Sequence, residues 1–513
     1  MAMIQDTTIR FQTSPTDKAT AFQAVENLFQ ALNHSGIRYC HWKSNLRLEW
    51  GMQGRTDLDL LVDPAHAQVF KQVLAEHHIK AFLAPPGKRY PALEDYMGFD
   101  PSSGKFFHLH VHNQLVLGEQ FVKNYQLPLE GQFLDSIQLK SGVKIPAPEL
   151  ELIVLSIRAL LKYRDRDAIK DILSIRSPGI PAHIMGEINW LLNQTCLKKV
   201  SETLNSVSDP IPPDPILDFL NTMIMTPRAG YRLYRLRQSV RKAIRVYQRH
   251  NRLWASITYF KEFWRRRKSF LKLTPERKMT NPRGGLTLAL VGVDGSGKTT
   301  ISRELATWLD WKLDVHTYYL GSKQPSWMSE RSYLLFRIAR RSHRSVSKLL
   351  GENNFISRLI EALRQALLYS HYLLTGYDRY RRYLAGKRNA QTGSIILFDR
   401  YPLEAPLDGP QIHLAGENDP WRFADTFSRL ERKLYQEIQM PDLLFVLEVS
   451  PEVSLERKPD HDWAAIEAKN IALGKLATLI EAAPKKVGVS YINASLPLDI
   501  VLGQIKQKIW EAL

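Results

Sequence analysis

Cysteine is scarce in this 513-residue chain, and long hydrophobic runs are missing from its sequence. The two cysteines, Cys40 and Cys196, are too few for a disulfide framework or a zinc site built on thiolates. The longest apolar runs, such as LTLALVGV and LLFVLEV, are far shorter than the roughly 20 residues that cross a bilayer. The first residues, MAMIQDTTIRFQTSPTDK, contain no apolar segment of the kind found in secretion signals. We therefore expect a protein of the reducing cytoplasm.

Acidic residues are nearly missing from residues 228–283, where Glu262 is almost the only acid. The formal net charge is +18, and a second basic stretch covers residues 331–388. Both stretches carry apolar residues at helical spacing, which predicts basic amphipathic helices. Trp254 and Trp264, set among arginines, favour contact with nucleic acid or with an anionic membrane surface, as for a protein peripheral to the inner membrane face. An ordinary solvated helix face is the alternative. A homodimer also stays open.

The hydrophobic pattern divides the chain into four parts. Residues 21–145 alternate helical and strand patterns, which is typical of an α+β domain. Residues 146–226 are helical, residues 227–283 form a basic helical linker, and residues 284–513 begin a fresh βα pattern. The predicted fold class is therefore multidomain α/β, with a helical middle and a C-terminal parallel sheet flanked by helices.

A phosphate-binding pattern, G-x-x-x-x-G-K-[ST], lies in the segment LALVGVDGSGKTTISRELATWL at residues 288–309. A buried-type strand precedes the glycines and an amphipathic helix follows them. Glycines let successive backbone N–H groups surround a phosphate, and the helix N-terminus adds the positive end of its dipole. Lys298 would bridge the β- and γ-phosphates, and the Thr299 hydroxyl would hold Mg²⁺. The predicted nucleotide site consists of Gly292, Asp294, Gly295, Ser296, Gly297, Lys298, Thr299 and Thr300.

Residues 286–513 resemble thymidylate kinases, because four motifs occur in the order of that family. The loop VDGSGKTT is followed by SIILFDRYP, in which Asp-Arg-Tyr ends a strand. Arg379 lies 21 residues before Arg400, which is the family's spacing between its two acceptor-reading arginines. The last two motifs are MPDLLFVLEVSPEVSLERK, which resembles the strand and helix that feed the lid, and YINASLPLDIVLGQIKQKI, which resembles the adenine-contacting loop and the last helix.

The resemblance implies a P-loop kinase that uses ATP and Mg²⁺ and phosphorylates a small molecule that already carries a phosphate. Phosphoryl transfer needs positioning and charge neutralisation, which Lys298, Arg400 and a lid cation would supply. Asp399 would organise Mg²⁺, and the Arg400 fork would hold the acceptor phosphate. A structural ion pair at a strand end is the alternative for Asp399 and Arg400. Further implied residues are the lid cations Arg457 and Lys458, Asp294 and Arg379 at the acceptor, and Asn493 and Ser495 at the adenine.

The chain departs from the thymidylate kinase pattern where the base is read. After Asp-Arg-Tyr it continues PLEAPLDGP, without the family's serine and Ala-Tyr-Gln. Thr375 stands where an aromatic residue normally stacks on thymine, and Lys323 is the one candidate to replace an arginine in YYLGSKQPS. Because phosphate-handling residues are kept while base-reading residues differ, the acceptor stays open between a nucleotide, a phosphorylated sugar and a lipid-linked intermediate.

The N-terminal segment YCHWKSNLRLEWGMQGRTDLDLLVD places two carboxylates on one strand face. Asp57 and Asp59, spaced i and i+2, are the arrangement that a metal pair needs to bind a triphosphate. The segment resembles the nucleotidyltransferase fold, in which a serine contacts the phosphates and the two aspartates hold the metals. Ser44 would be that serine, and Lys43 would assist. An exposed strand face is the alternative.

A third carboxylate is expected from a later strand in the nucleotidyltransferase fold, but here that strand reads FFHLHVHNQ. Its histidines, His108, His110 and His112, share one face. They would bind a transition metal or donate to phosphates, or they form a half-buried polar row without a ligand.

Three functions compete at this point. The first is a kinase of the thymidylate kinase type fused to a nucleotidyltransferase-like module. The second is a nucleotide-gated protein that docks nucleic acid or membrane through its basic helices with little turnover. The third makes the N-terminal module the only working enzyme. An acceptor pocket with Arg379 and Arg400 favours the first, since a pure switch needs no such pocket.

Overall fold

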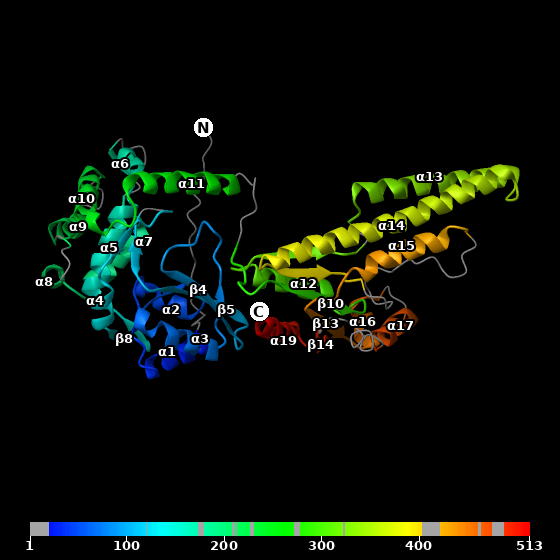
Figure 1. Ribbon diagram of the computed structural model, residues 1–513. Coiled ribbons are helices and arrows are strands. Elements are labelled where there is room, and N and C mark those ends of the chain that lie inside the picture. Colours follow the sequence, from blue (N-terminus) through cyan, green and yellow to red (C-terminus); the bar gives the residue numbers. More distant parts are fainter. Residues whose placement is uncertain are drawn as a thin grey trace, which may run out of the picture. The chain divides into compact units, whose positions relative to one another are not determined.

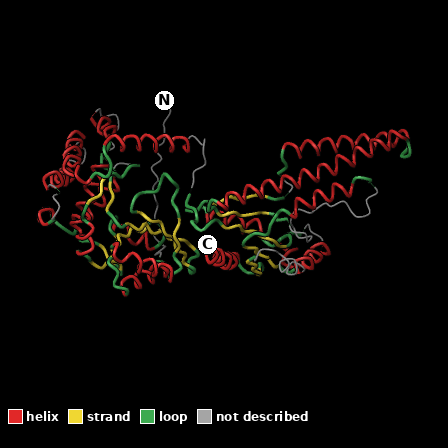
Figure 2. The backbone as a smooth tube through the Cα atoms, in the orientation of Figure 1, coloured by secondary structure: helices red, strands yellow, loops and turns green. Residues whose placement is uncertain are grey.

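The computed structural model describes most of the chain and divides it into two compact units (Figure 1). Unit 1 holds the residues up to Lys80 and Tyr90–Lys261, and unit 2 holds Ala81–Arg89 and Glu262–Leu513. Both units mix helices with strands (Figure 2). The described residues are 20–118, 121–172, 179–207, 211, 213–225, 230–270, 278–321, 324–402, 421–459, 463–474 and 487–513.

The main sheet of unit 1 carries the strands β1, β2, β5 and β4 in this order, and only Lys80 of β3 belongs to unit 1. β2 runs parallel to β5, while β1 and β4 run antiparallel to β2 and β5, respectively. The bounds are β1 (Tyr39–His41), β2 (Leu58–Val62), β3 (Lys80–Phe82), β4 (Leu93–Asp100) and β5 (Lys105–His112).

Helices cover one face of the unit 1 sheet. Leu58, Leu60 and Val62 of β2 pack in one buried cluster with side chains of α1 (Gln23–His34) and α3 (Ala67–Glu76). Because side chains alternate along a strand, the neighbouring residues Asp57 and Asp59 point to the opposite face. The polar residues predicted for this site are therefore carried on the sheet face that α1 and α3 leave uncovered.

A helical region completes unit 1 and shares a core with the sheet. Trp42 and Leu61 belong to the same buried cluster as apolar residues from α5 to α10. The predicted boundary between residues 145 and 146 falls inside this shared core, so the four-part division stays a prediction. The helices are α5 (Pro148–Lys162), α6 (Asp165–Ile172), α7 (Ala182–Leu192), α8 (Leu197–Ser206), α9 (Pro213–Met225), α10 (Gly230–Ala243) and α11 (Arg252–Phe270).

Short elements connect these parts of unit 1. Two hairpins pair β6 (Leu115–Leu117) with β7 (Tyr125–Leu127) and β8 (Gln138–Lys140) with β9 (Val143–Ile145). The remaining elements are η1 (Asn45–Arg47), α2 (Leu48–Met52), η2 (Pro64–His66), α4 (Glu130–Asp135) and η3 (Ile244–Tyr247).

The sheet of unit 2 is parallel, as the sequence pattern predicts, and has the strand order β11-β12-β10-β13-β14. Continuous apolar strands such as LTLALVG are typical of a sheet buried on both faces. The bounds are β10 (Leu286–Gly292), β11 (Val315–Tyr319), β12 (Ile395–Asp399), β13 (Leu443–Glu448) and β14 (Gly488–Asn493).

Helices lie against both faces of this sheet. Ala289 and Val291 of β10 are buried with Tyr383 of α14 and Tyr435 of α15, while α12 and α19 contact the sheet and each other. The long helices α13 and α14 run side by side and extend beyond the sheet (Figure 1). The bounds are α12 (Lys298–Leu309), α13 (Trp327–Leu350), α14 (Phe355–Gln391), α15 (Ala424–Gln436), α16 (Pro451–Arg457), α17 (Trp463–Gly474) and α19 (Leu498–Ala512).

Two further sequence predictions can be compared with the described residues. Lys323, predicted to contact the acceptor, lies outside the described residues. Within the described part of the chain, no helix combines the length and the apolar character that a membrane span requires.

Candidate functional site

The predicted phosphate-binding loop joins β10 to α12, so strand, loop and helix occur as the sequence indicates. Gly295 and Gly297 both have φ of +83°, a left-handed conformation that side chains rarely adopt. A Cβ on Gly295 would also lie 2.8 Å from the carbonyl oxygen of Ser454, which is too close for any side chain. These two glycines let the backbone curl immediately before the helix N-terminus, where N–H groups lack intrahelical partners.

Lys298 folds back into the phosphate-binding loop. Its ammonium donates to the carbonyl oxygens of Gly292 at 3.0 Å and Val293 at 2.7 Å, and the residue is buried. The next two residues, Thr299 and Thr300, are exposed in the first turn of α12. The loop therefore holds a buried cation beside hydroxyls that solvent reaches, which suits an anionic ligand of several oxygens.

Two lysines, one from the predicted lid motif and one from α17, lie near Asp294 of the loop. Lys469 Nζ lies 2.5 Å from one carboxylate oxygen of Asp294, and Lys458 Nζ lies 3.8 Å from the other. Ser454 of α16 also donates its hydroxyl to the Asp294 carbonyl. Lys458 was predicted as a lid cation, whereas Lys469 carries no motif and was missed. Lys469 lies on α17, one helix beyond the predicted lid motif, and only the folded structure shows that it approaches the loop.

Arg457 connects the phosphate-binding loop to the predicted adenine loop. Its guanidinium donates to the carbonyl oxygens of Gly295 at 3.3 Å and Ala494 at 3.0 Å. Ala494 lies between the two residues predicted to contact adenine, and the Ser495 N–H donates to the Asn493 side chain at 3.0 Å. The three segments thus converge at one end of the sheet, and the roles of Arg457, Asn493 and Ser495 toward a nucleotide stay predictions.

Asp399 is the last residue of β12, which is paired in parallel with β10, and Arg400 follows it. Because the carboxyl ends of parallel strands meet at one sheet edge, Asp399 and Arg400 share that edge with the phosphate-binding loop. Arg400 has φ of +61°, which is uncommon for a residue with a side chain. Such strain is found at functional sites, and the choice between acceptor binding and a structural ion pair for Arg400 stays a prediction.

Arg379 is buried in α14 and donates to the hydroxyl of Tyr435 on α15. Burial raises the pKa of nearby Glu431 to about 7, an effect that the positive charge of Arg379 opposes. The described contacts of Arg379 thus lead to α15, and its predicted position opposite Arg400 at an acceptor phosphate stays a prediction.

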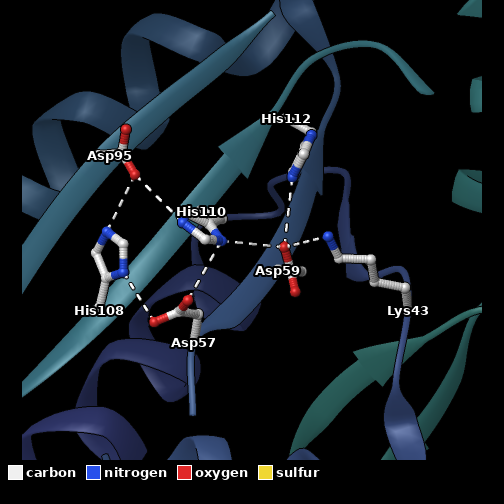
Figure 3. Close-up of polar contacts among 7 residues, drawn as sticks. All are labelled: Lys43, Asp57, Asp59, Asp95, His108, His110 and His112. Carbon is white, nitrogen blue, oxygen red and sulfur yellow. Dashed lines mark hydrogen bonds and ion pairs between the residues drawn. The ribbon is translucent and has the colours of Figure 1, made fainter. Parts of the chain in front are cut away.

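A second polar cluster lies on the sheet face of unit 1, as Figure 3 shows. Its members, which we name the Asp–His cluster, are Lys43, Asp57, Asp59, Asp95, His108, His110 and His112. His110 lies opposite Asp59 on one neighbouring strand and opposite Asp95 on the other. The structure therefore brings the predicted aspartates and histidines together.

The third carboxylate of this cluster, Asp95, was not among the predicted residues. It lies on β4, between β2 and the histidine strand β5 in the chain. Both His108 Nε2 and His110 Nε2 face Asp95 Oδ1, at 3.1 Å and 3.3 Å. Asp95 was missed because its antiparallel register with β5, not its sequence neighbourhood, brings it to the histidines.

Charges in the Asp–His cluster shift the pKa values of its members. Burial disfavours the charged form of Asp59, but Lys43 at 2.7 Å and the neighbouring histidines hold its pKa well below the ordinary value. Burial works against the charge of His110 too, yet Asp59 and Asp95 raise its pKa to about 9. Burial lowers the pKa of His112 to about 4. The cluster thus fixes a negative Asp59 between cations.

Further basic side chains lie in this region of unit 1. Lys43 and Arg158 lie against the Trp42 ring, with their charged groups 4.8 Å and 5.6 Å from its centre. Burial, and then the charge of Lys43, lower the pKa of Lys123 to about 7. Ser44, predicted to contact phosphates, adopts a left-handed backbone with φ of +60°. This arrangement suits an anionic ligand on the Asp59 side of the cluster.

The basic helices expose aromatic side chains. Trp254, Phe260 and Trp264 of α11 are exposed. The second basic stretch also exposes apolar residues, among them Leu334 and Ile338 of α13. Helices are present in both basic stretches, and their partner stays a prediction.

Comparisons with known proteins concern the kinase resemblance. No protein-family model matches the chain. It is 29% identical over 192 residues to the uncharacterised ATP-binding protein YghS of Escherichia coli, covering 36% of this chain and 77% of that protein. It is also 28% identical over 203 residues to the uncharacterised ATP-binding protein YghR of Escherichia coli, and that alignment covers 37% of this chain and 75% of YghR. A probable thymidylate kinase 2 of Saccharolobus solfataricus is 26% identical over 173 residues, covering 34% of this chain and 63% of that protein.

A solved structure of deoxyadenosine kinase from M. mycoides with bound dATP aligns at a TM-score of 0.26 and 13% identity, covering 44% of this chain and 98% of that one. The resemblance of unit 1 to nucleotidyltransferases stays a prediction, since none of these relatives is described as one. The sequence similarities, together with the phosphate-binding loop, identify a P-loop-kinase-like region in the chain.

Proposed function

We propose that unit 2 transfers the γ-phosphoryl group of ATP to a phosphorylated small molecule, a nucleoside monophosphate or an acceptor of similar chemistry. The observation that supports this proposal is the parallel pairing of β10 with β12, because the phosphate-binding loop follows β10 while Asp399 ends β12 and Arg400 follows it at the same sheet edge. The names of the relatives, which include two ATP-binding proteins and a probable thymidylate kinase, support the same reaction class.

Lys298 and two oxygen donors would handle the nucleotide. The Lys298 ammonium, which contacts two loop carbonyls, would exchange them for β- and γ-phosphate oxygens. The Thr299 hydroxyl and the Asp399 carboxylate are hard oxygen donors of the kind that Mg²⁺ prefers, and Thr299 is exposed at the loop. A Mg²⁺ ion held there would neutralise phosphate charge.

Arginines and the lid would complete the transfer. The acceptor oxygen forms a bond to the γ-phosphorus, the bond from that phosphorus to the β–γ bridging oxygen breaks, and ADP leaves with the electron pair. Arg400 would hold the acceptor phosphate as a fork, with Arg379 as a second cation. Lys458 and Lys469 lie near the Asp294 carboxylate of the loop. They would stabilise the negative charge that develops on the transferred phosphoryl group.

The test is ADP release by the full chain with ATP, Mg²⁺ and a panel of nucleoside monophosphates, sugar phosphates and polyprenyl phosphates. We expect one acceptor class to accelerate ADP release, and Lys298→Met to lower kcat by about 100-fold or more. Lys508→Met is the matched control, because Lys508 forms an exposed ion pair with Glu511 on α19 and should leave the rate unchanged. If no acceptor stimulates ADP release, the proposal is wrong.

A fused module in unit 1 is the second part of this proposal. The cations around Asp59 favour a phosphorylated substrate, as a nucleotidyltransferase-like module would bind. Replacing Asp57 and Lys298 separately distinguishes the two units. Loss of pyrophosphate release in Asp57→Asn alone, with ADP release kept, would assign nucleotidyl transfer to unit 1. Retention of pyrophosphate release in Asp57→Asn would contradict it.

A nucleotide-gated docking protein is the candidate from another functional class. The exposed aromatic residues of α11, set among arginines, favour it. Salt-sensitive sedimentation with anionic liposomes or retention on DNA, weakened in Trp264→Ala and altered by ATP, would support this role. Acceptor-dependent turnover without any such binding would contradict it.

A further inference from the structure

We propose that the Asp–His cluster of unit 1 binds one divalent transition-metal ion through Asp57, His108 and His110. This ion differs in kind from the magnesium that the two predicted aspartates would hold together. The inference is independent of the kinase proposed for unit 2.

Asp59 is poorly suited to act with Asp57 as a carboxylate pair for magnesium. Its Oδ1 atom already lies 2.7 Å from Lys43 Nζ and 3.4 Å from His112 Nε2. Magnesium prefers a shell of oxygen ligands, and the side chains that converge on Asp57 are imidazoles. The donor set therefore does not fit the ion that a carboxylate pair would take.

Two imidazoles face Asp57 in the geometry of metal ligands. His108 Nδ1 lies 2.9 Å from Asp57 Oδ1, and His110 Nδ1 lies 3.7 Å from Asp57 Oδ2 and 3.3 Å from Asp59 Oδ1. One donor atom from each of the three residues lies within 4.8 Å of the others. Ligand atoms bound about 2.1 Å from one ion are separated by roughly 3–3.5 Å, so small side-chain adjustments would bring all three to an ion.

Asp95 orients both rings from behind. Its Oδ1 atom faces the Nε2 atoms of His108 and His110 at 3.1 Å and 3.3 Å (Figure 3). If each Nε2–H donates to Asp95, the Nδ1 lone pair of His108 points toward Asp57 and that of His110 toward the space between Asp57 and Asp59. A carboxylate that accepts from the distal nitrogen of a metal-binding histidine is a common supporting interaction at metal centres. This arrangement explains why a buried carboxylate lies behind two histidines whose rings meet edge to face.

The chemistry of the three donors selects the class of ion. Two imidazole nitrogens and one carboxylate suit zinc, cobalt, manganese or iron, and leave coordination positions open. The Asp57 and His110 side chains are about one quarter exposed, so an ion can enter from solvent, whereas His108 is almost fully buried. The neighbouring cations Lys43 and Arg158 would attract an anionic co-ligand to the open positions.

Cobalt binding to the full, tag-free chain tests the site. After chelator treatment and dialysis, we expect one equivalent of Co²⁺ to produce visible absorption bands that Zn²⁺ removes and millimolar Mg²⁺ does not. Asp57→Asn and His110→Ala should each weaken cobalt binding at least 10-fold, and Asp95→Asn by about 10- to 100-fold. Circular dichroism checks that the variants fold, and the partly exposed Asp57 serves if a histidine variant does not.

His316→Ala is the matched control in unit 2. His316 Nε2 lies 3.4 Å from an Asp314 oxygen, which reproduces a single histidine–carboxylate contact. The control should bind cobalt like the wild-type chain. The proposal is overturned if the wild-type chain binds no stoichiometric cobalt, if folded Asp57→Asn and His110→Ala bind it as tightly as the wild type, or if His316→Ala loses it equally. None of these readouts depends on ADP release, so failure here and failure of the kinase proposal are distinguishable.

Discussion

Lys469 of α17 lies 2.5 Å from the carboxylate of Asp294 in the phosphate-binding loop. Asp294 is buried, and Lys458 approaches its other oxygen at 3.8 Å. A buried carboxylate keeps its charge at low cost only when cations compensate it. The ion pair therefore couples the position of α17 to the loop that we propose binds ATP.

Replacing Lys469 should destabilise unit 2 through Asp294. We expect Lys469→Met to cost about 1–2 kcal/mol, because Lys458 compensates only part of the buried charge, and to lower Tm by about 2–6 °C. In an Asp294→Asn background the same change should have little effect. Differential scanning fluorimetry of the four proteins checks this, and simple additivity of the two substitutions would contradict the coupling.

Substitutions at Arg400 should separate the effect of its guanidinium on activity from the effect of its backbone conformation on stability. Its φ of +61° favours glycine, so Arg400→Gly should be more stable than Arg400→Ala by about 0.5–1 kcal/mol. Both variants should lose acceptor-dependent ADP release, since neither has the guanidinium fork. Arg400→Lys should raise KM for the acceptor, because an ammonium cannot bind a phosphate through two parallel donors. Steady-state kinetics and thermal unfolding provide the two readouts, and full activity in Arg400→Ala would contradict the role.

The local sequence pattern was sufficient to predict the phosphate-binding loop. Glycine spacing, an apolar strand and an amphipathic helix are set by residues close in sequence, and the structure has the same order from β10 to α12. The parallel sheet could be predicted for the same reason, because its strands read as continuous apolar runs.

Tertiary contacts explain what the sequence could not show. Asp95 joins the histidines only through the β4–β5 register, and Lys469 reaches Asp294 although 175 positions separate them. Residues 146–226 read as a helical domain and 227–283 as a basic helical linker, yet many apolar side chains up to Ile244 share a core with Trp42 and Leu61. Composition and periodicity predict that a helix has a buried face, but they do not specify which segment it packs against.

Glu431 should make stability fall as pH rises. Burial raises its pKa to about 7 in the folded protein, above the value of about 4.3 in an unfolded chain. Between these values the folded state binds more protons than the unfolded state, so the free energy of unfolding decreases as pH increases from about 5 to 7. Above the pKa of Glu431 in the folded protein, this contribution to the free energy of unfolding is completely lost.

Glu431→Gln should remove this dependence. The amide stays neutral at every pH. Between pH 5 and pH 8, the free energy of unfolding of the variant should therefore rise by roughly 1–3 kcal/mol relative to that of the wild type. Glu151, whose pKa burial also raises to about 7, contributes a similar slope in unit 1 and is unchanged in this comparison. Thermal unfolding of both proteins across that pH range is the measurement. Parallel curves for wild type and variant would show that Glu431 does not titrate there.

Gly295→Ala should damage the loop, whereas Gly503→Ala should stabilise its helix. At Gly295 the added methyl group meets the Ser454 carbonyl oxygen at 2.8 Å and φ is +83°, so we expect a loss of about 2 kcal/mol or more and no detectable ATP binding. At Gly503 of α19 no described atom lies within 4 Å of the new methyl group, and alanine should add about 1 kcal/mol. Thermal unfolding and titration with a fluorescent ATP analogue measure both. Equal Tm changes in the two variants would contradict this prediction, because the same added group would then act independently of backbone conformation and of the Ser454 contact.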